Sequence, residues 1–172
     1  MKKIIFAAIL GLATCMVGAA QDKTAAVPNF SGDWEIDLAK STVPATGGPK
    51  ITGYKLTVTQ STKTIDVASL ITLDADPGTI AQSRTFNLDG TESDTELKLM
   101  QMSAPAKVKG TWLDGGKLEL SMSANIKTEE GSMAISQSDV WELTDGGQAL
   151  KIHRVRTRPG SSEVSDMVFA KK

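Results

Sequence analysis

Residues 29–41 read NFSGDWEIDLAKS, and the pattern of this stretch decides the fold class. Its apolar residues Trp34, Ile36 and Leu38 alternate with acidic residues at the positions between and before them. Such period-two alternation is typical of a strand with one face buried. The stretch therefore predicts a strand that opens the domain and places a tryptophan in its core.

The rest of the chain repeats this alternation in short segments separated by turn residues. The clearest segment runs from Leu118 to Ile126, where every second residue is apolar. Asp-Gly pairs at 89–90, 114–115 and 145–146 follow predicted strands and favour tight hairpins. Consecutive strands joined in this way form an antiparallel meander. We therefore expect an all-β fold, an antiparallel up-and-down β-barrel of about 8–10 strands.

Closure of the meander into a barrel is favoured over two other outcomes. The Cys…Trp…Cys pattern of an immunoglobulin-type sandwich is absent from the sequence. A closed barrel also leaves no unpaired strand edge that invites aggregation. One predicted strand, Leu97 to Met102, is expected to end at the Ser103-Ala104-Pro105 segment that follows it.

The first twenty residues combine the three parts of a bacterial secretory signal. They begin with Lys2 and Lys3, continue with an apolar run over 4–13, and end with small residues over 18–20. The apolar run is too short to span a bilayer. We expect a signal peptide over 1–20, a leader over 21–28 and one lipocalin-like barrel domain over 29–172, in a periplasmic or secreted protein.

A second way of processing the N-terminus remains open. The segment Leu12-Ala13-Thr14-Cys15 resembles the lipobox of bacterial lipoproteins, in which the cysteine is acylated. Thr14 departs from the small residues usual before that cysteine. The alternatives for Cys15 are therefore a lipid anchor or an apolar filler that is removed with the signal.

Charge and residue inventory argue against several function classes. Loss of Lys2 and Lys3 takes the basic residues from 19 to 17 against 20 acidic residues, a formal charge of −3. This balance gives no footprint for nucleic acid. The chain has one histidine, His153, no cluster with metal-ligand spacing and no glycine-rich phosphate loop. We expect a protein that is not an enzyme and uses no metal or cofactor; a hydrolase or isomerase built on carboxylates is a distant alternative.

Gly32-Asp33-Trp34, placed near the mature N-terminus ahead of a meander, resembles the Gly-x-Trp signature of lipocalins and their bacterial lipocalin-like relatives. The resemblance implies a calycin-type barrel in which this tryptophan plugs the closed end. It also implies structural roles for Gly32 and Trp34.

The resemblance extends to a group of secreted bacterial proteins with a Phe-Ser-Gly-x-Trp opening and a late Trp-x-Leu strand. The residues that match are Phe30, Ser31, Gly32, Trp34, Asp37, Lys40, Ser41, Trp141, Leu143, Val168 and Phe169. Two lipocalin features are missing: the late Thr-Asp-Tyr element and a last-strand arginine over the tryptophan. Val164 to Ala170 offers only Asp166 as a charge.

Polar residues interrupt the apolar face of two neighbouring predicted strands. Gln137 and Asp139 share a face with Trp141, and Arg154 and Arg156 share a face with Ile152. A buried charge must be paired, so a plain apolar core would exclude arginine from these positions. The residues therefore predict a site where arginine holds an anionic head group.

Two alternatives explain the same residues without a ligand. Asp139 and Arg154 can form a salt bridge that closes the barrel end, or a β-bulge can turn the polar residues towards water. Met122 and Trp112 are further candidates for the lining of a ligand cavity, because a flexible thioether and an aromatic ring suit varied apolar ligands. Both residue types also fill ordinary cores.

These observations favour an exported protein that binds a small apolar or amphiphilic molecule, with an acidic head group as one option. The competing interpretation is a filled barrel that acts by surface contact as an envelope accessory protein. An internal cavity of a few hundred cubic ångströms, about the size of a ligand pocket, would distinguish the first from the second.

Overall fold

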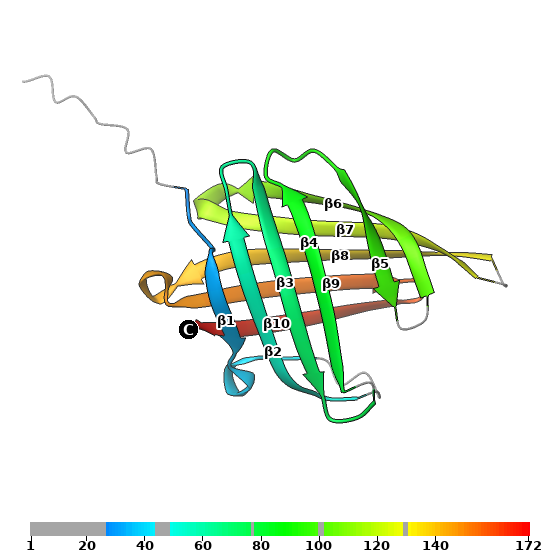
Figure 1. Ribbon diagram of the computed structural model, residues 1–172, viewed down its shortest axis with the longest axis horizontal. Helices are drawn as coiled ribbons and strands as arrows, with labels where there is room; N and C mark the ends of the chain where they lie inside the picture. The colour runs from blue at the N-terminus through cyan, green and yellow to red at the C-terminus, as the bar shows by residue number, and fades with distance from the viewer. Residues whose placement is uncertain (1–26, 44–48, 77, 100–101, 129–130) are drawn as a thin grey trace, which may run out of the picture.

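The computed structural model describes residues 27–43, 49–76, 78–99, 102–128 and 131–172, in which ten antiparallel strands form one nearly closed barrel (Figure 1). The strands are β1 Gly32–Ile36, β2 Ile51–Gln60, β3 Thr64–Leu73, β4 Thr79–Asn87, β5 Ser93–Leu99, β6 Met102–Leu113, β7 Lys117–Thr128, β8 Gly131–Thr144, β9 Ala149–Arg158 and β10 Ser161–Lys171. Three single-turn 3₁₀ helices, η1 Leu38–Lys40, η2 Asp114–Gly116 and η3 Asp145–Gly147, complete the described elements. The all-β barrel predicted from the sequence is confirmed.

The strand order is β4-β3-β2-β1-β10-β9-β8-β7-β6-β5, so β1 lies between β2 and the last strand. β4 and β5 follow one another in sequence, yet they are the two ends of the sheet and share no ladder. The loop after β4 instead folds onto β6, where the Gly90 backbone N–H donates to the Gly110 carbonyl at 3.0 Å. The expected full closure is therefore wrong at this one seam.

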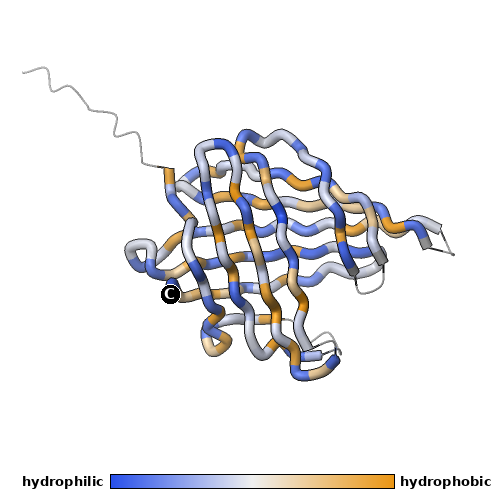
Figure 2. The backbone as a smooth tube through the Cα atoms, viewed as in Figure 1, coloured by the Kyte–Doolittle hydropathy of each residue, from blue (hydrophilic) through white to orange (hydrophobic). Residues whose placement is uncertain are grey.

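The alternation of apolar and polar residues places the core inside the barrel. Figure 2 shows hydrophobic and hydrophilic residues alternating along the strands. Leu118, Leu120, Met122, Ala124 and Ile126 of β7 are all buried, as their spacing predicts. The Asp-Gly turns also form as expected, because Gly90, Gly115 and Gly146 adopt positive φ angles that favour glycine.

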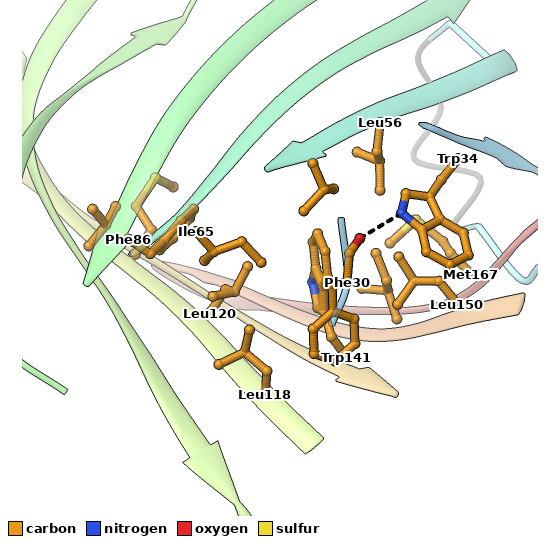
Figure 3. Packing of buried hydrophobic residues seen from close by; sticks show 14 of the residues in the cluster. Phe30, Trp34, Leu56, Ile65, Phe86, Leu118, Leu120, Trp141, Leu150 and Met167 are labelled. Carbon is orange, nitrogen blue, oxygen red and sulfur yellow. Dashed lines mark hydrogen bonds between the residues drawn. The ribbon is translucent and has the colours of Figure 1, made fainter. Parts of the chain in front are cut away.

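Aromatic side chains fill the end of the barrel where the chain enters. Trp34 is 1% exposed and donates its indole N–H to the Phe30 carbonyl at 3.0 Å (Figure 3). The Phe30 ring packs edge-on against Trp141 at 5.8 Å and stacks on Trp112 at 6.2 Å between centroids. The opening segment therefore buries Trp34 in the core at this end of the barrel, and the structural role that the resemblance implied for it remains a prediction.

A lysine of the last strand covers this tryptophan, in place of the arginine that the sequence lacks there. β10 extends to Lys171, whose Nζ lies 5.3 Å from the centroid of the Trp34 ring. Gly32 has φ +137°, and a Cβ there would lie 2.8 Å from Lys171 Cε. A glycine two residues before Trp34 thus leaves space for the lysine, which explains the spacing of the motif physically.

The first strand ends earlier than its alternation predicts. β1 stops at Ile36, and the turn η1 carries Leu38 to the surface, where it is 42% exposed. Asp37 caps this turn by accepting from the Ala39 backbone N–H at 3.2 Å. The side-chain cap competes with strand continuation, so the expectation of a buried Leu38 was wrong.

Pro105 does not end a strand, also contrary to expectation. It lies within β6, opposite Glu96 of β5, whereas the pairing of β6 with β7 begins one residue later at Ala106. Pro105 therefore occupies a stretch with only one neighbouring strand, the kind of position in a sheet where proline is tolerated. The predicted strand at Leu97 to Met102 is divided between β5 and β6.

The predicted signal peptide and Cys15 lie outside the described residues and remain predictions. Within the described part of the chain, no helix has the length and apolar character needed to cross a bilayer.

Candidate functional site

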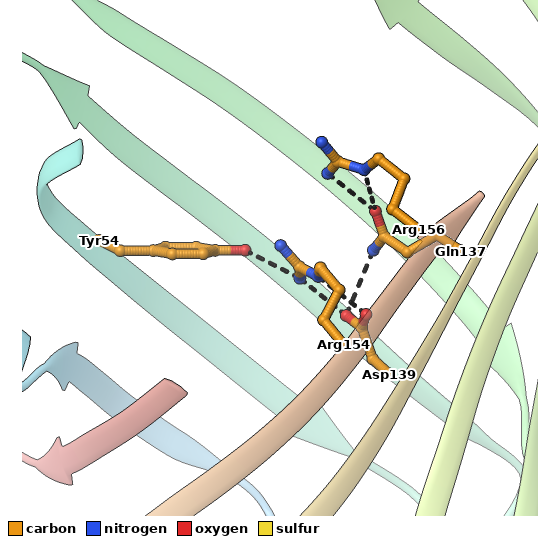
Figure 4. A network of polar contacts seen from close by, with 5 residues as sticks. All are labelled: Tyr54, Gln137, Asp139, Arg154 and Arg156. Atoms are coloured by element: carbon orange, nitrogen blue, oxygen red, sulfur yellow. Dashed lines mark hydrogen bonds and ion pairs between the residues drawn. The ribbon is translucent and has the colours of Figure 1, made fainter. Parts of the chain in front are cut away.

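A polar network lies inside the barrel, next to the aromatic plug, and is built from β2, β8 and β9 (Figure 4). Asp139 is 6% exposed and accepts from Arg154 Nε at 2.8 Å and Arg154 Nη2 at 2.7 Å. This two-point contact is the geometry in which a planar guanidinium binds a carboxylate most strongly. Arg154 also donates to the Tyr54 hydroxyl at 3.3 Å.

The network continues outward along the same two strands. Gln137 donates from Nε2 to Asp139 Oδ2 at 3.3 Å and accepts at Oε1 from Arg156, whose Nη2 lies 3.0 Å away. The structure thus brings together four predicted site residues, because Gln137 pairs with Arg156 and Asp139 with Arg154 in the β8–β9 register. No bulge turns them towards water, so that alternative is wrong.

The sequence analysis missed two members of this site. Arg84 of β4 has its Nε buried without a hydrogen-bond partner among the described residues. Tyr54 of β2 is 4% exposed and supports Arg154 from the opposite wall. The sequence does contain a sign of both residues, because Tyr54 shares a strand face with Leu56, and Arg84 shares one with Phe86. It does not show which strands face each other across the barrel.

Burial and like charge act on the guanidinium groups that lack an acidic partner. Burial lowers the pKa of Arg84, and the neighbouring Arg154 adds to the effect. Burial likewise lowers the pKa of Arg156, with Arg154 the next cause. Burial alone would also lower the pKa of Arg154, but attraction to Asp139 outweighs it and raises that pKa. All three groups nevertheless stay protonated, as arginine does in proteins.

The free space beside the network is small. A space of about 40 Å³ is bordered by polar residues of the network and by apolar residues of the core. The residues that line it are Tyr54, Leu56, Val67, Ser69, Arg84, Phe86, Leu120, Met122, Gln137, Asp139, Trp141, Ile152 and Arg154. A space of this size has room for one or two waters, at about 30 Å³ each in the liquid. The space beside the network is therefore far smaller than a ligand pocket of a few hundred cubic ångströms.

The two other predicted site residues, Met122 and Trp112, lie in different parts of the barrel interior. Met122 is 8% exposed and borders the 40 Å³ space, next to the network. Trp112 stacks on Phe30 in the aromatic plug and does not border that space. The ligand role of Met122 remains a prediction, and the structure does not bring Trp112 to the other candidates.

Larger hollows occur on the outside of the barrel. One of about 670 Å³ runs along the ends of β5 to β9 and is lined mainly by outward-facing residues such as Lys107, Ser123 and Thr157. It does not share a lining residue with the polar network. Among the described residues, no group of three or more His, Cys, Asp and Glu side chains is placed to hold a metal ion.

Comparison with known proteins supports the architecture. No family model matches the chain, and no curated protein matches it in sequence. The fold is similar to that of zebrafish ileal bile acid-binding protein, whose crystal structure contains cholic acid. The two share 16% sequence identity over 83% of this chain and 98% of the other, with a TM-score of 0.50. At this identity the likeness establishes the fold alone: the chain is an antiparallel β-barrel similar in architecture to that protein.

Proposed function

We propose that this chain is an exported barrel that binds a small, mostly apolar molecule through an anionic head group held by its interior arginines. One observation carries the proposal. Within the described residues, the interior network holds three guanidinium groups, of Arg84, Arg154 and Arg156, against the single carboxylate of Asp139. A buried cation without a counter-charge is costly, so a bound anion would stabilise this arrangement.

The size of the free space limits how such a ligand fits. The 40 Å³ beside Arg84 and Arg154 suits the head group and not the tail. The tail would have to displace side chains or leave the barrel between β4 and β5. That seam has no backbone ladder, so its separation breaks no inter-strand hydrogen bonds between the two strands. Met122 borders the space and can change rotamer to make room.

The calycin-type fold supports the proposal without identifying a ligand. The similar zebrafish protein is a bile acid-binding protein, and bile acids are amphiphiles with an acidic group. A likeness of this kind makes a small amphiphilic acid the first ligand class to test.

A second candidate is a filled barrel that acts by surface contact. The small interior space favours it, because the aromatic plug and the polar network together occupy most of the core. In this candidate the Asp139–Arg154 pair serves only to hold β8, β9 and β2 together.

Calorimetric titration of the full chain with decanoate and with decanol separates the two candidates. Decanoate should bind more tightly than decanol because only decanoate carries the charge that the arginines attract. Arg156→Gln should weaken decanoate binding by about 1.5–3 kcal/mol, as for loss of a hydrogen bond to a charged group. It should leave decanol binding unchanged. Absence of decanoate binding would favour the filled barrel, and decanoate affinity that is unchanged in the variant would contradict a ligand role for Arg156.

A further inference from the structure

The described interior of the barrel carries two more positive charges than negative ones. A ligand with a single negative charge would therefore neutralise only half of the surplus. In the described residues of the network, three arginines face one aspartate. One further ion pair lies at the exposed end of β9, where Arg158 Nη2 contacts Glu163 Oε2 at 3.0 Å. That pair is neutral as a whole, so its inclusion leaves the same surplus of two positive charges.

The two surplus charges can be assigned to particular side chains. Arg154 is matched by Asp139 through two hydrogen bonds. Arg156 donates only to the neutral amide oxygen of Gln137. Arg84 makes no ion pair among the described residues, and its Nε is buried and unpartnered. Arg84 and Arg156 are therefore the two cations that await an anion.

Both surplus cations act on the same central pair. The electrostatic neighbours of Arg84 include Arg154 and Asp139, and those of Arg156 include the same two residues. Figure 4 shows the guanidinium group of Arg154 beside Asp139 and that of Arg156 beside Gln137, both of β8. Arg84 borders the 40 Å³ space from β4, across from Gln137 and Asp139 of β8. Arg156 itself does not border this space but is bound to Gln137, which does. A compact head group placed there would contact Arg84 directly and reach Arg156 by displacing the Gln137 amide.

We propose that this site selects a head group with two negative charges on one compact centre, namely a phosphate monoester. This inference rests on the proposed function, since it names the class of anion that the same site takes. A phosphate monoester carries close to two charges above its second pKa of about 6, on three terminal oxygens that accept strong hydrogen bonds. A dicarboxylate also carries two charges, but on two separate groups that the small space does not accommodate together.

Decyl phosphate and decyl sulfate provide a matched test, because their tails are the same and their heads are both tetrahedral. They differ in charge at about pH 8, where the phosphate is mainly dianionic and the sulfate is monoanionic. The full chain should bind decyl phosphate about tenfold more tightly than decyl sulfate, the value of one added charge-assisted hydrogen bond. At about pH 5 the phosphate loses its second charge, and the advantage should disappear.

Substitutions test whether Arg84 and Arg156 cause the preference for decyl phosphate over decyl sulfate. Arg84→Gln and Arg156→Gln should each reduce the preference for phosphate over sulfate, whereas Arg158→Gln should retain it because that arginine is already paired. Removal of an unmatched buried cation should not unfold the barrel, and a thermal scan checks this. If a variant does not fold, the two ligands compared on the unsubstituted chain still decide the matter.

Each outcome bears on a different claim. Equal affinity for decyl phosphate and decyl sulfate at about pH 8 overturns the two-charge inference and leaves the proposed function standing. Failure of decyl phosphate, decyl sulfate and decanoate to bind better than decanol overturns the proposed function itself. Inorganic phosphate bound as tightly as decyl phosphate supports the two-charge site and contradicts an apolar tail as part of the ligand.

Discussion

Arginine and lysine are distributed differently between the inside of this barrel and its surface. The sequence contains four arginines: Arg84, Arg154 and Arg156 occupy inward-facing positions of β4 and β9, and Arg158 is exposed at the end of β9. Arginine suits such positions because its planar guanidinium is weakly hydrated and can bind carboxylates or phosphates at two points. Lysines form the exposed pairs instead, such as Lys107 with Asp94 at 3.0 Å.

The Asp139–Arg154 pair should show the strong coupling of a buried ion pair. Arg154→Met should lower the free energy of unfolding by about 3–5 kcal/mol, because Asp139 is left buried without its main partner. Adding Asp139→Asn should restore part of the loss by removing the stranded charge. Chemical denaturation of both variants gives the two values.

An exposed pair is the matched control for this prediction. Lys107→Met breaks the Lys107–Asp94 pair on the outer face and should leave stability unchanged, since solvent screens such pairs. A double variant as unstable as Arg154→Met alone would contradict the coupling and indicate that Arg154 stabilises the barrel by packing.

At the scale of elements, the seam between β4 and β5 is the least regular part of the barrel. The end of β4 meets β6 instead of β5, and Gly110 is the residue that permits the approach. A Cβ at Gly110 would lie 3.0 Å from the Asn87 carbonyl oxygen and 3.1 Å from Leu88 Cδ2. Both distances are shorter than ordinary contacts, so a side chain there has to push β4 away.

Gly110→Ala should therefore lower the free energy of unfolding by about 1–3 kcal/mol, the usual cost of overpacking. Gly53→Ala is the matched control on β2, because its Cβ would meet Thr72 side-chain atoms at ordinary distances of 3.4 and 3.5 Å. The control should change stability by no more than about 0.5 kcal/mol. Equal effects in both variants, measured by thermal or chemical unfolding, would show that β4 is not packed tightly on β6.

At the scale of the whole molecule, local pattern predicted much of the architecture. Period-two alternation and Asp-Gly turns predicted the all-β class, the up-and-down order of the strands and the burial of Trp34. The strand ends at Leu38 and Pro105 did not, because they depend on a capping side chain and on which neighbour a strand has. The cation over Trp34 was missed because Lys171 lies one residue beyond the expected last strand.

The site was predictable only along neighbouring strands. Gln137, Asp139, Arg154 and Arg156 lie on β8 and β9, which pair directly, so alternation alone placed them together. Tyr54 of β2 and Arg84 of β4 lie on strands that do not pair with β8 or β9, and they border the same small space as Asp139 and Arg154. Contacts across a barrel depend on its curvature and closure, which no single segment of sequence encodes.

The arginine side-chain signals of the protein offer the most direct test of an anion site inside the barrel. With four arginines, a ¹H–¹⁵N spectrum of the Nε–Hε groups contains few signals, and each reports on one position. Titration with decanoate should shift the Arg84 and Arg156 signals saturably and leave that of Arg158 unchanged, because Arg158 is already paired with Glu163. A titration that moves none of the interior signals, or only that of Arg158, would contradict the account.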